Sequence, residues 1–428
     1  MKLVDGCRTT LGACALALAS VFPAAGTAEG VPALVGDGKT DDTAAIQARL
    51  DSGATLVYLP PPAKAYVISK TLRIGSGQEL RLDRHSVIRL APNSDCPMLE
   101  NRAYRGGLDR SFTVSGGVWD MDNLRQRQID SHVPELWKNR PERHDPGYFL
   151  GMAMRFANVE GMTLRDMTFR NPVLYAAAFS KVSHFTVADI VFDYRTWRTK
   201  PLNMDGIHVD GCCHHGRITN LRGTCYDDMV ALLANDTICA VQEGPVTDID
   251  VDGIYAEFSH SAVRLLSAGE PVKRITIRNV HGNFYTYTVG LTWYPGRPGG
   301  VFEDIVIEDV FAAKALTPKE TGGCDWRGRF PIVNVEGPAK VGSLIVSRVH
   351  RDERTLPSPT FGTGKDVVID RLVVRDCHME NRLNEPIPFL DVKGRVKESA
   401  VERNALSGFW TGCRLATEPE GVTPNLMD

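Results

Sequence analysis

The feature that most constrains this chain is a short motif that recurs along its centre. Two apolar residues enclose two mostly polar ones, and alternating apolar and polar residues precede each copy. Copies begin at Leu164, Val187, Ile218, Val251, Ile277, Ile307, Val346 and Ile369. Alternation with a period of two, rich in β-branched side chains, predicts β-strands. Acidic residues inside the motif (Asp166, Asp189, Asp309 and Asp370) are expected in turns, because Asp tolerates left-handed backbone.

A second set of apolar pairs advances in step with the first. It comprises Ile207/Val209, Val230/Leu232, Val263/Leu265 and Val289/Leu291. The shortest step in either set is 23 residues, from 164 to 187 and from 207 to 230. Two strand families that repeat together predict a solenoid in which each strand pairs in parallel with its copy in the next coil. We therefore expect an all-β fold, a right-handed single-stranded parallel β-helix.

The N-terminal region departs from the repeat. Residues 1–28 combine a basic start, an apolar run and small residues before a cleavage site, which predicts a secretory signal peptide. Next, Asp41-Asp42-Thr43 precedes the amphipathic segment 44–50, which predicts a capped helix. That helix would cover the open N-terminal end of the solenoid and its unpaired strand edges.

These boundaries divide the chain into three parts. Residues 1–28 form the signal peptide, residues 29–380 the β-helix with its N-terminal cap, and residues 381–428 a C-terminal tail or cap, because the repeat fades there. Within the β-helix, residues 120–150 are polar and aperiodic, so we expect an insertion loop beside a cleft.

Composition limits the partners and the location. The chain has 49 basic and 52 acidic residues, which excludes nucleic-acid binding by bulk charge. After the signal peptide no stretch of 18 apolar residues remains, so we expect no membrane span and a secreted or periplasmic protein. The eight remaining cysteines lack zinc-like spacing, so no metal or cofactor is expected. They could pair or stay free, and a bridge among Cys212, Cys213 and Cys225 would be structural.

Three carboxylates recur at the spacing of one coil. Asp205 precedes Asp227 and Asp228 by 22 and 23 residues. Because neighbouring parallel strands lie about 4.8 Å apart, these side chains should stack on one outer face. Their mutual repulsion implies either a bound cation or a catalytic use. Glycoside hydrolysis needs such a set, with one protonated acid for the leaving oxygen and one carboxylate to activate water or attack carbon.

These motifs resemble a known family. The segment GDGKTDDTAAIQ (36–47) is similar to the N-terminal cap of pectin-degrading β-helix enzymes, which have the pectin lyase-like fold. Asn203-Met204-Asp205-Gly206 and Asp227-Asp228 resemble the two acidic motifs of glycoside hydrolase family 28, the polygalacturonases. The resemblance implies an inverting, metal-independent hydrolase. Asp227 or Asp228 would be the general acid, Asp205 with the other would activate water, and Asn203 would contact substrate.

The chain departs from the family in the next two strands. His260 fills the histidine position, but serines replace the two flanking glycines. Where the family has Arg-Ile-Lys to hold the galacturonate carboxylate, this chain has the neutral, aromatic strand Val289-Gly290-Leu291-Thr292-Trp293, which supplies no cation for an acidic sugar. Arg264 could replace the missing cation or pair with an acid of the cluster. Trp293 and Tyr294 could stack on a sugar ring or simply pack.

The other histidines near these motifs have no predicted role in the reaction. His208, His214 and His215 are expected at the surface or in turns. The adjacent pair His214-His215 lacks a third ligand at a spacing typical of metal sites.

Three functions remain open on this basis. The leading hypothesis is a secreted glycoside hydrolase that inverts configuration and acts on a polysaccharide or oligosaccharide, either pectin-like or a related glycan. The second is a polysaccharide lyase or uronate epimerase, in which the three Asp residues would hold Ca²⁺ and Arg264 or His260 would abstract a proton. The third is a carbohydrate-binding β-helix without catalysis.

Overall fold

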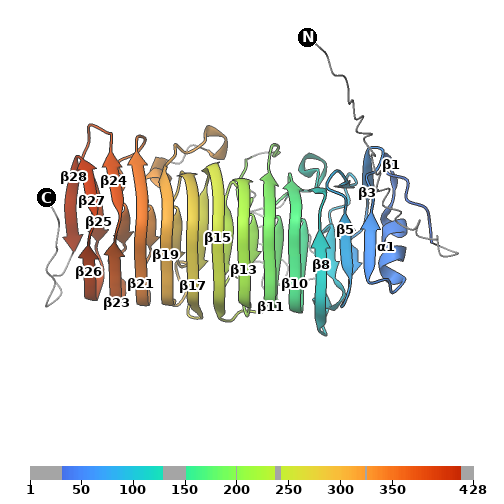
Figure 1. Cartoon of the computed structure of the whole chain (residues 1–428), viewed down its shortest axis with the longest axis horizontal. Helices are drawn as coiled ribbons and strands as arrows, with labels where there is room; N and C mark the ends of the chain where they lie inside the picture. The colour runs from blue at the N-terminus through green and yellow to red at the C-terminus, as the bar shows by residue number, and fades with distance from the viewer. Residues whose placement is uncertain (1–30, 129–150, 199, 237–241, 323–324, 416–428) are drawn as a thin grey trace, which may run out of the picture.

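The chain forms one long parallel β-helix whose coils follow one another along a single axis (Figure 1). The computed structural model describes residues 31–128, 151–198, 200–236, 242–322 and 325–415. The predicted signal peptide and residues 129–150 of the predicted insertion lie outside the described residues. Among the described residues, no helix is long and apolar enough to span a bilayer.

Short strands dominate the N-terminal end of the chain, and longer strands follow. The N-terminal coils contain β1 (Asp37–Asp41), β2 (Leu56–Leu59), β3 (Ala65–Ile68), β4 (Leu72–Ile74), β5 (Glu79–Leu82), β6 (Val87–Leu90), β7 (Leu99–Asn101), β8 (Asp109–Ser115) and β9 (Val118–Asp120). The central coils contain β10 (Met154–Arg170), β11 (Ala177–Asp193), β12 (Ile207–Val209), β13 (His214–Thr224), β14 (Asp228–Leu233), β15 (Val246–Ser259), β16 (Ser261–Leu266), β17 (Pro271–Phe284), β18 (Val289–Thr292), β19 (Gly300–Lys314), β20 (Val333–Val335) and β21 (Ala339–Glu353). The last coils contain β22 (Phe361–Thr363), β23 (Val367–Arg375), β24 (His378–Asn381), β25 (Ile387–Val392), β26 (Arg395–Glu402), β27 (Ala405–Gly408) and β28 (Trp410–Leu415). The helical elements are α1 (Thr43–Asp51) and the 3₁₀ turns η1 (Arg102–Arg105), η2 (Asn123–Arg125), η3 (Lys319–Thr321) and η4 (Asp325–Arg329).

The two strand families predicted from the repeat pair as expected. Each central coil has one long strand and one short strand. In the long strands, one row runs through Leu164, Val187, Ile218, Val251, Ile277, Ile307 and Val346. In the short strands, another row runs through Ile207, Val230, Val263 and Val289. All of these side chains are buried. Burial of each is worth about 1.5–3 kcal/mol, so the rows form a continuous core inside the tube.

Two bends that recur among the central long strands explain the motif. The second bend falls on the third motif residue, which has a positive φ at Asp166, Asp189, Asn220, Gly253, Asn279, Asp309 and Arg348. The first bend lies five residues earlier, as at Gly161, His184 and His215. Gly, Asn and Asp tolerate this backbone best. The turn role predicted for Asp166, Asp189 and Asp309 is therefore confirmed.

The last predicted copy of the motif is wrong in register. Val346 pairs with Val374, whereas Ile369 pairs with Val341. The second bend of this coil therefore lies at Asp376, whose φ is 56°. Asp370 lies inside β23 and not in a left-handed turn. Buried apolar residues flank both bend positions of this coil. The segment beginning at Ile369 therefore has the same pattern as the motif, although it lies at the first bend position and not at the second.

Parallel pairing continues past residue 380, where the repeat fades in the sequence. β25 pairs with β22, β26 with β23, β27 with β24 and β28 with β25. The residues from 387 to 415 therefore extend the ladder by further strands rather than leaving it.

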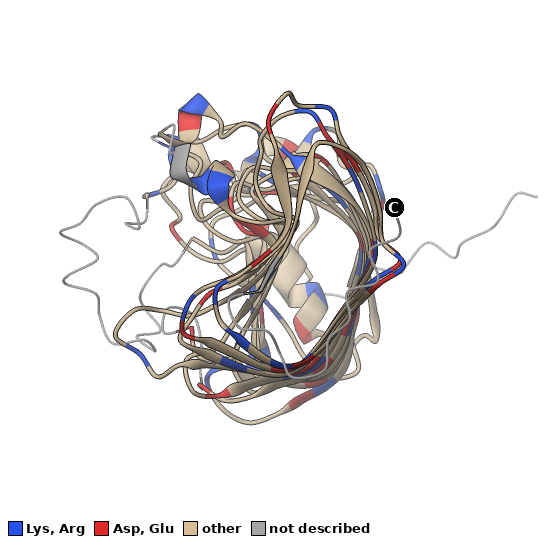
Figure 2. Ribbon diagram, turned by 90° about the vertical axis from the view of Figure 1, so that its left-hand side faces the viewer, with Lys and Arg blue, Asp and Glu red and all other residues tan. Residues whose placement is uncertain are grey.

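Helix α1 lies at the N-terminal end of the tube (Figure 1). Figure 2, viewed from the C-terminal side, shows it across the far end of the coils. Ile46 and Leu50 of α1 are buried in the core. The cap differs in detail from the prediction, because Asp42 accepts hydrogen bonds from the backbone of Val35 and Gly36 and does not cap α1.

The described cysteines are unbridged. Cys96, Cys212, Cys213, Cys225, Cys377 and Cys413 are all free thiols. The structural bridge considered among Cys212, Cys213 and Cys225 is therefore not formed. Cys213 and Cys225 instead pack in the apolar core.

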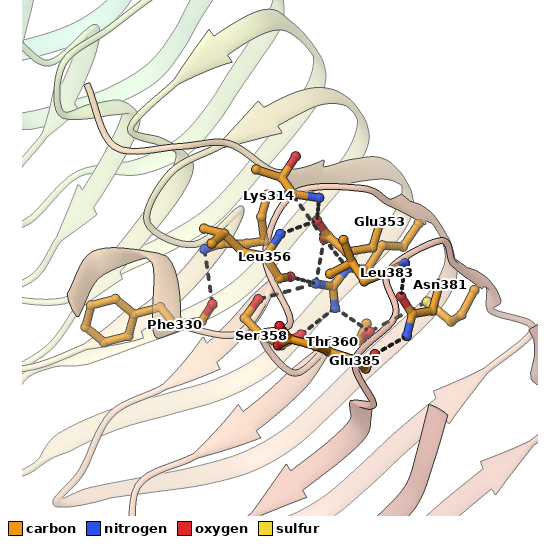
Figure 3. A network of polar contacts seen from close by, with 12 residues as sticks. Lys314, Phe330, Glu353, Leu356, Ser358, Thr360, Asn381, Leu383 and Glu385 are labelled. Atoms are coloured by element: carbon orange, nitrogen blue, oxygen red, sulfur yellow. Dashed lines mark hydrogen bonds and ion pairs between the residues drawn. The ribbon is translucent and has the colours of Figure 1, made fainter. Parts of the chain in front are cut away.

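The polar network in Figure 3 lies where β21 leads into β22. Arg351 and Glu353 are fully buried, and Arg351 Nη2 lies 2.6 Å from Glu353 Oε2. Nearby, the buried Lys314 ammonium donates to the backbone carbonyl groups of Thr286 and Phe330. The bond to Phe330 ties the segment just before β20 to the end of β19.

Connections of different length separate the long strands from the short strands. A single residue joins β15 to β16, whereas residues 315–332 join β19 to β20. The bends inside the long strands show no such variation, since they recur at the same register position in coil after coil.

Candidate active site

Consecutive coils bring the three predicted acids together. Asp205 lies two residues before Ile207, and Asp228 lies two residues before Val230, with which Ile207 pairs. The Gly206 amide donates to the Asp228 carbonyl oxygen at 2.9 Å, which fixes the two coils at this point. Asp205 and Asp228 therefore occupy equivalent positions, and Asp227 directly precedes Asp228.

The three carboxyl groups differ in their exposure. The Asp227 side chain is 23% exposed, whereas those of Asp205 and Asp228 are 5% and 2% exposed. The sequence interpretation placed all three on an outer face, but neighbouring side chains bury two of them. Asp227 is consequently the acid that a ligand reaches first.

Basic side chains surround the Asp227–Asp228 pair. His260 Nδ1 lies 3.4 Å from Asp227 Oδ1 and 3.8 Å from Asp228 Oδ1. Arg264 Nη1 lies 3.9 Å from Asp228 Oδ2, and the Ser261 hydroxyl donates to Asp228 Oδ1. Ser261 thus places a hydrogen-bond donor at the acids.

The two adjacent acids have pKa values shifted in opposite directions. Burial and the neighbouring Asp228 raise the pKa of Asp227, although His260 opposes this shift. Burial by itself would also raise the pKa of Asp228, but His260 and Arg264 outweigh it and bring this pKa below its usual value. Asp227 therefore retains a proton at a pH at which Asp228 is ionised.

Asp205 belongs to a second, deeper group that the sequence interpretation missed. Its Oδ2 lies 2.9 Å from His208 Nδ1, and His208 Nε2 lies 3.1 Å from Asp236 Oδ2. The prediction of a surface or turn position for His208 is wrong, because its side chain is only 2% exposed. Alternation places His208 on the outer face of β12, opposite the core residues Ile207 and Val209, so the sequence carried no signal for its burial.

The remaining predicted site residues lie at different distances from the acids. The Arg264 Nε donates to Thr292 Oγ1 at 2.8 Å, and its guanidinium lies 5.3 Å from the Tyr294 ring centroid. Tyr294 packs against Ala231, Leu233 and Leu266, so packing is its observed role. Asn203 is half-buried in a left-handed turn before Asp205.

Trp293 lines a pocket further along the short strands. This pocket has a volume of about 490 Å³ and is also lined by Asn334, Glu336 and Lys393. Glu336 is not among the residues predicted from the sequence. Its pKa is raised by burial, although the Arg264 charge opposes this shift. The Arg264 charge thus acts on both Asp228 and Glu336.

Two sets of described side chains bring three possible metal ligands within 4.8 Å of one another: Asp227, Asp228 and His260, and His208, Asp210 and Asp236. Each set contains an imidazole, whereas Ca²⁺ prefers six to eight oxygen ligands. In the second set the imidazole is already hydrogen-bonded to Asp236. Among the described residues, Asp205 does not join Asp227 and Asp228 in one such set, so the Ca²⁺ cluster of the lyase hypothesis is not formed by these three acids.

Comparisons with known proteins identify the fold. No protein-family model and no curated protein sequence match the chain. The surface adhesin PfbA of Streptococcus pneumoniae matches with a TM-score of 0.56 and 14% identity, over 92% of this chain and 94% of the adhesin. Endo-xylogalacturonan hydrolase from Aspergillus tubingensis matches with a TM-score of 0.53 and 15% identity, over 92% and 98%. A Yersinia enterocolitica family 28 exopolygalacturonase matches with a TM-score of 0.50 and 14% identity, over 88% and 77%. At these identities the similarity shows a shared β-helix fold.

Proposed function

We propose that this protein is a glycoside hydrolase that acts on a polysaccharide or oligosaccharide with inversion. The observation that carries the proposal is the adjacent pair Asp227 and Asp228, whose pKa values are shifted in opposite directions. Two carboxyl groups driven apart in this way supply the acid and the base that glycosidases need.

Exposure and charge assign the individual roles. Asp227, whose pKa is raised and which is partly exposed, donates its proton to the glycosidic oxygen as the bond to the anomeric carbon breaks. Asp228, which is ionised, acts with Asp205 to accept a proton from the water that attacks the anomeric carbon. The products are a new reducing end and a free alcohol, and the proton lost by Asp227 is balanced by the proton taken from water. His260 and Arg264 stabilise the negative charge of the Asp227–Asp228 pair.

The sugar class follows from the charges around the pair. Arg264 already lies 3.9 Å from Asp228 and also opposes the burial that raises the pKa of Glu336, and the next position along its row is Gly290, which carries no cation. A neutral sugar avoids the repulsion that these acids would exert on a uronate carboxylate. The pocket beside Trp293 would bind the part of the glycan next to the scissile bond. The predicted signal peptide supports action outside the cytoplasm.

The decisive experiment is a panel of neutral and uronate-containing polysaccharides assayed for new reducing ends, with and without chelator. Wild-type protein should release reducing ends without calcium, Asp228→Asn should not, and ¹H NMR should show the inverted anomer first. An unsaturated, ultraviolet-absorbing product that requires Ca²⁺ would select the lyase instead. Binding without cleavage across the panel would select a carbohydrate-binding β-helix.

A further inference from the structure

The buried His208 occupies a space that the short-strand ladder leaves open for it. In register, its neighbours on the two sides are Ala178 of β11 and Ala231 of β14. These small side chains let the imidazole lie flat against the Tyr175 ring, with centroids 4.1 Å apart and planes 12° apart. The ring orientation is therefore set by packing before any hydrogen bond is considered.

Both nitrogens of this ring face carboxyl groups. Nδ1 lies 2.9 Å from Asp205 Oδ2, and Nε2 lies 3.1 Å from Asp236 Oδ2 and 3.7 Å from Asp210 Oδ2. An ionised carboxylate only accepts hydrogen bonds, so an imidazole between two of them donates from both nitrogens and carries a positive charge. The groups that face His208 are thus three acids and one tyrosine ring.

We propose that His208 is a positioning residue for Asp205: as an imidazolium held by Asp236, it keeps the Asp205 carboxyl group ionised and fixed beside the Asp227–Asp228 pair. The consequence for turnover rests on the proposed hydrolase function, whereas the charge state of His208 does not. With the shared proton on the imidazole, Asp205 is a carboxylate beside the Asp227–Asp228 pair. Loss of His208 would let Asp205 take up a proton and would leave fewer carboxylates to accept one from water.

The energetic sense agrees with this geometry. Burial alone lowers the pKa of His208, but its bonds to Asp205 and Asp236 raise it well above the usual value. Burial and Asp227 raise the pKa of Asp205 well above its usual value, and the bond from His208 is the largest influence that opposes them, so both partners of this contact hold a proton more tightly than usual. The pair therefore shares one proton, and the carboxylates on the Nε2 side favour its residence on the imidazole.

The charge state is tested by ¹⁵N NMR of histidine-labelled protein between pH 6 and pH 9. The signals of His208 are assigned by their loss in His208→Gln. We expect both ring nitrogens to remain protonated at pH 8 in the wild type, and Asp236→Asn to move the titration to lower pH. A neutral ring with a bare Nδ1 at pH 7 would overturn the proposal, whether or not the protein hydrolyses a glycan.

The positioning role is tested by kinetics on the glycan that the wild type cleaves. His208→Gln should lower kcat by about a hundredfold with KM changed by less than about twofold, and should move the acidic limb of the kcat profile. Asp236→Asn should act in the same direction, and it remains informative if His208→Gln does not fold. The exposed His215→Gln is the matched control. An unchanged pH profile in both His208→Gln and Asp236→Asn would rule out the positioning role of His208. If no variant and no wild type cleaves any glycan, the proposed function fails, and the NMR result still decides the state of His208.

Discussion

The buried pair of Arg351 and Glu353 allows a quantitative test of how polar groups are accommodated inside this solenoid. Both side chains are 0% exposed. Arg351 also donates to the Ser358 carbonyl oxygen at 2.8 Å and to Thr360 Oγ1 at 3.0 Å. Glu353 accepts from the backbone amides of Thr355 and Leu356 at 2.9 and 3.0 Å. Removal of the arginine therefore strands a buried carboxylate, while the backbone donors that face it remain.

The expected loss of stability follows from these contacts. Breaking a buried ion pair from one side costs about 3–5 kcal/mol, so Arg351→Met should lower the free energy of unfolding by that amount. In Arg351→Met/Glu353→Gln, the amide oxygen still accepts from the two amides and no buried charge is left. The double variant should therefore be more stable than Arg351→Met alone, by about 1–3 kcal/mol.

The assay is urea unfolding at pH 7, followed by circular dichroism, for the wild type, both single variants and the double variant. If Arg351→Met does not fold, recovery of folded protein by the second substitution gives the same answer. The reasoning is refuted if Arg351→Met costs less than about 1 kcal/mol, or if the two substitutions are additive, since the free energies should couple across the pair.

Three further outcomes are expected. Asp227→Asn should lower hydrolysis of a natural glycan by about 10²–10⁴-fold. Aryl glycosides with a good leaving group should restore most of that rate in Asp227→Asn but not in Asp228→Asn, and equal loss on both substrates would contradict the assigned roles. Arg264→Met removes a charge that lowers the pKa of Asp228, so the acidic limb of the kcat profile should move to higher pH, whereas Arg297→Met, at an ion pair with Glu243, should not move it. Burial lowers the pKa of Lys314 from 10.5 to about 7, so the unfolded chain binds more protons between these values. The stability of the wild type relative to Lys314→Met should then rise with pH across this window, by up to about 1.4 kcal/mol per pH unit. A flat difference between the two denaturation curves would show that the lysine is not buried as described.

The solenoid could be predicted because its coils repeat a local requirement. Each bend needs a residue that tolerates left-handed backbone between two buried apolar residues, and Asp166 and Asn279 show this requirement directly in the sequence. The same reasoning misplaced the last motif at Ile369, since two similar bends occur in one strand and only pairing distinguishes them. Continuation of the strands beyond residue 380 was missed because the exposed faces of β26 and β27 are polar and weakly patterned.

The candidate site was predictable only where it follows the coil spacing. Asp205 and Asp228 are one coil apart, so their proximity followed from arithmetic. His208 and Asp236 lie 28 residues apart, with Asp236 beyond the end of β14, and no periodicity connects them. Glu336 directly follows β20, which pairs with β18, but residues 315–332 lengthen this coil and obscure that register in the sequence.

The unequal connections between long and short strands have a consequence for how such a protein can diversify. Length changes there leave the register of the ladder untouched, because the next short strand still finds its partner in the preceding coil. The acids are rooted in the ladder, whereas the rim around them consists of these variable segments. Exchange of one rim segment for a longer or shorter one could therefore alter which glycan fits without disturbing the chemistry beneath it.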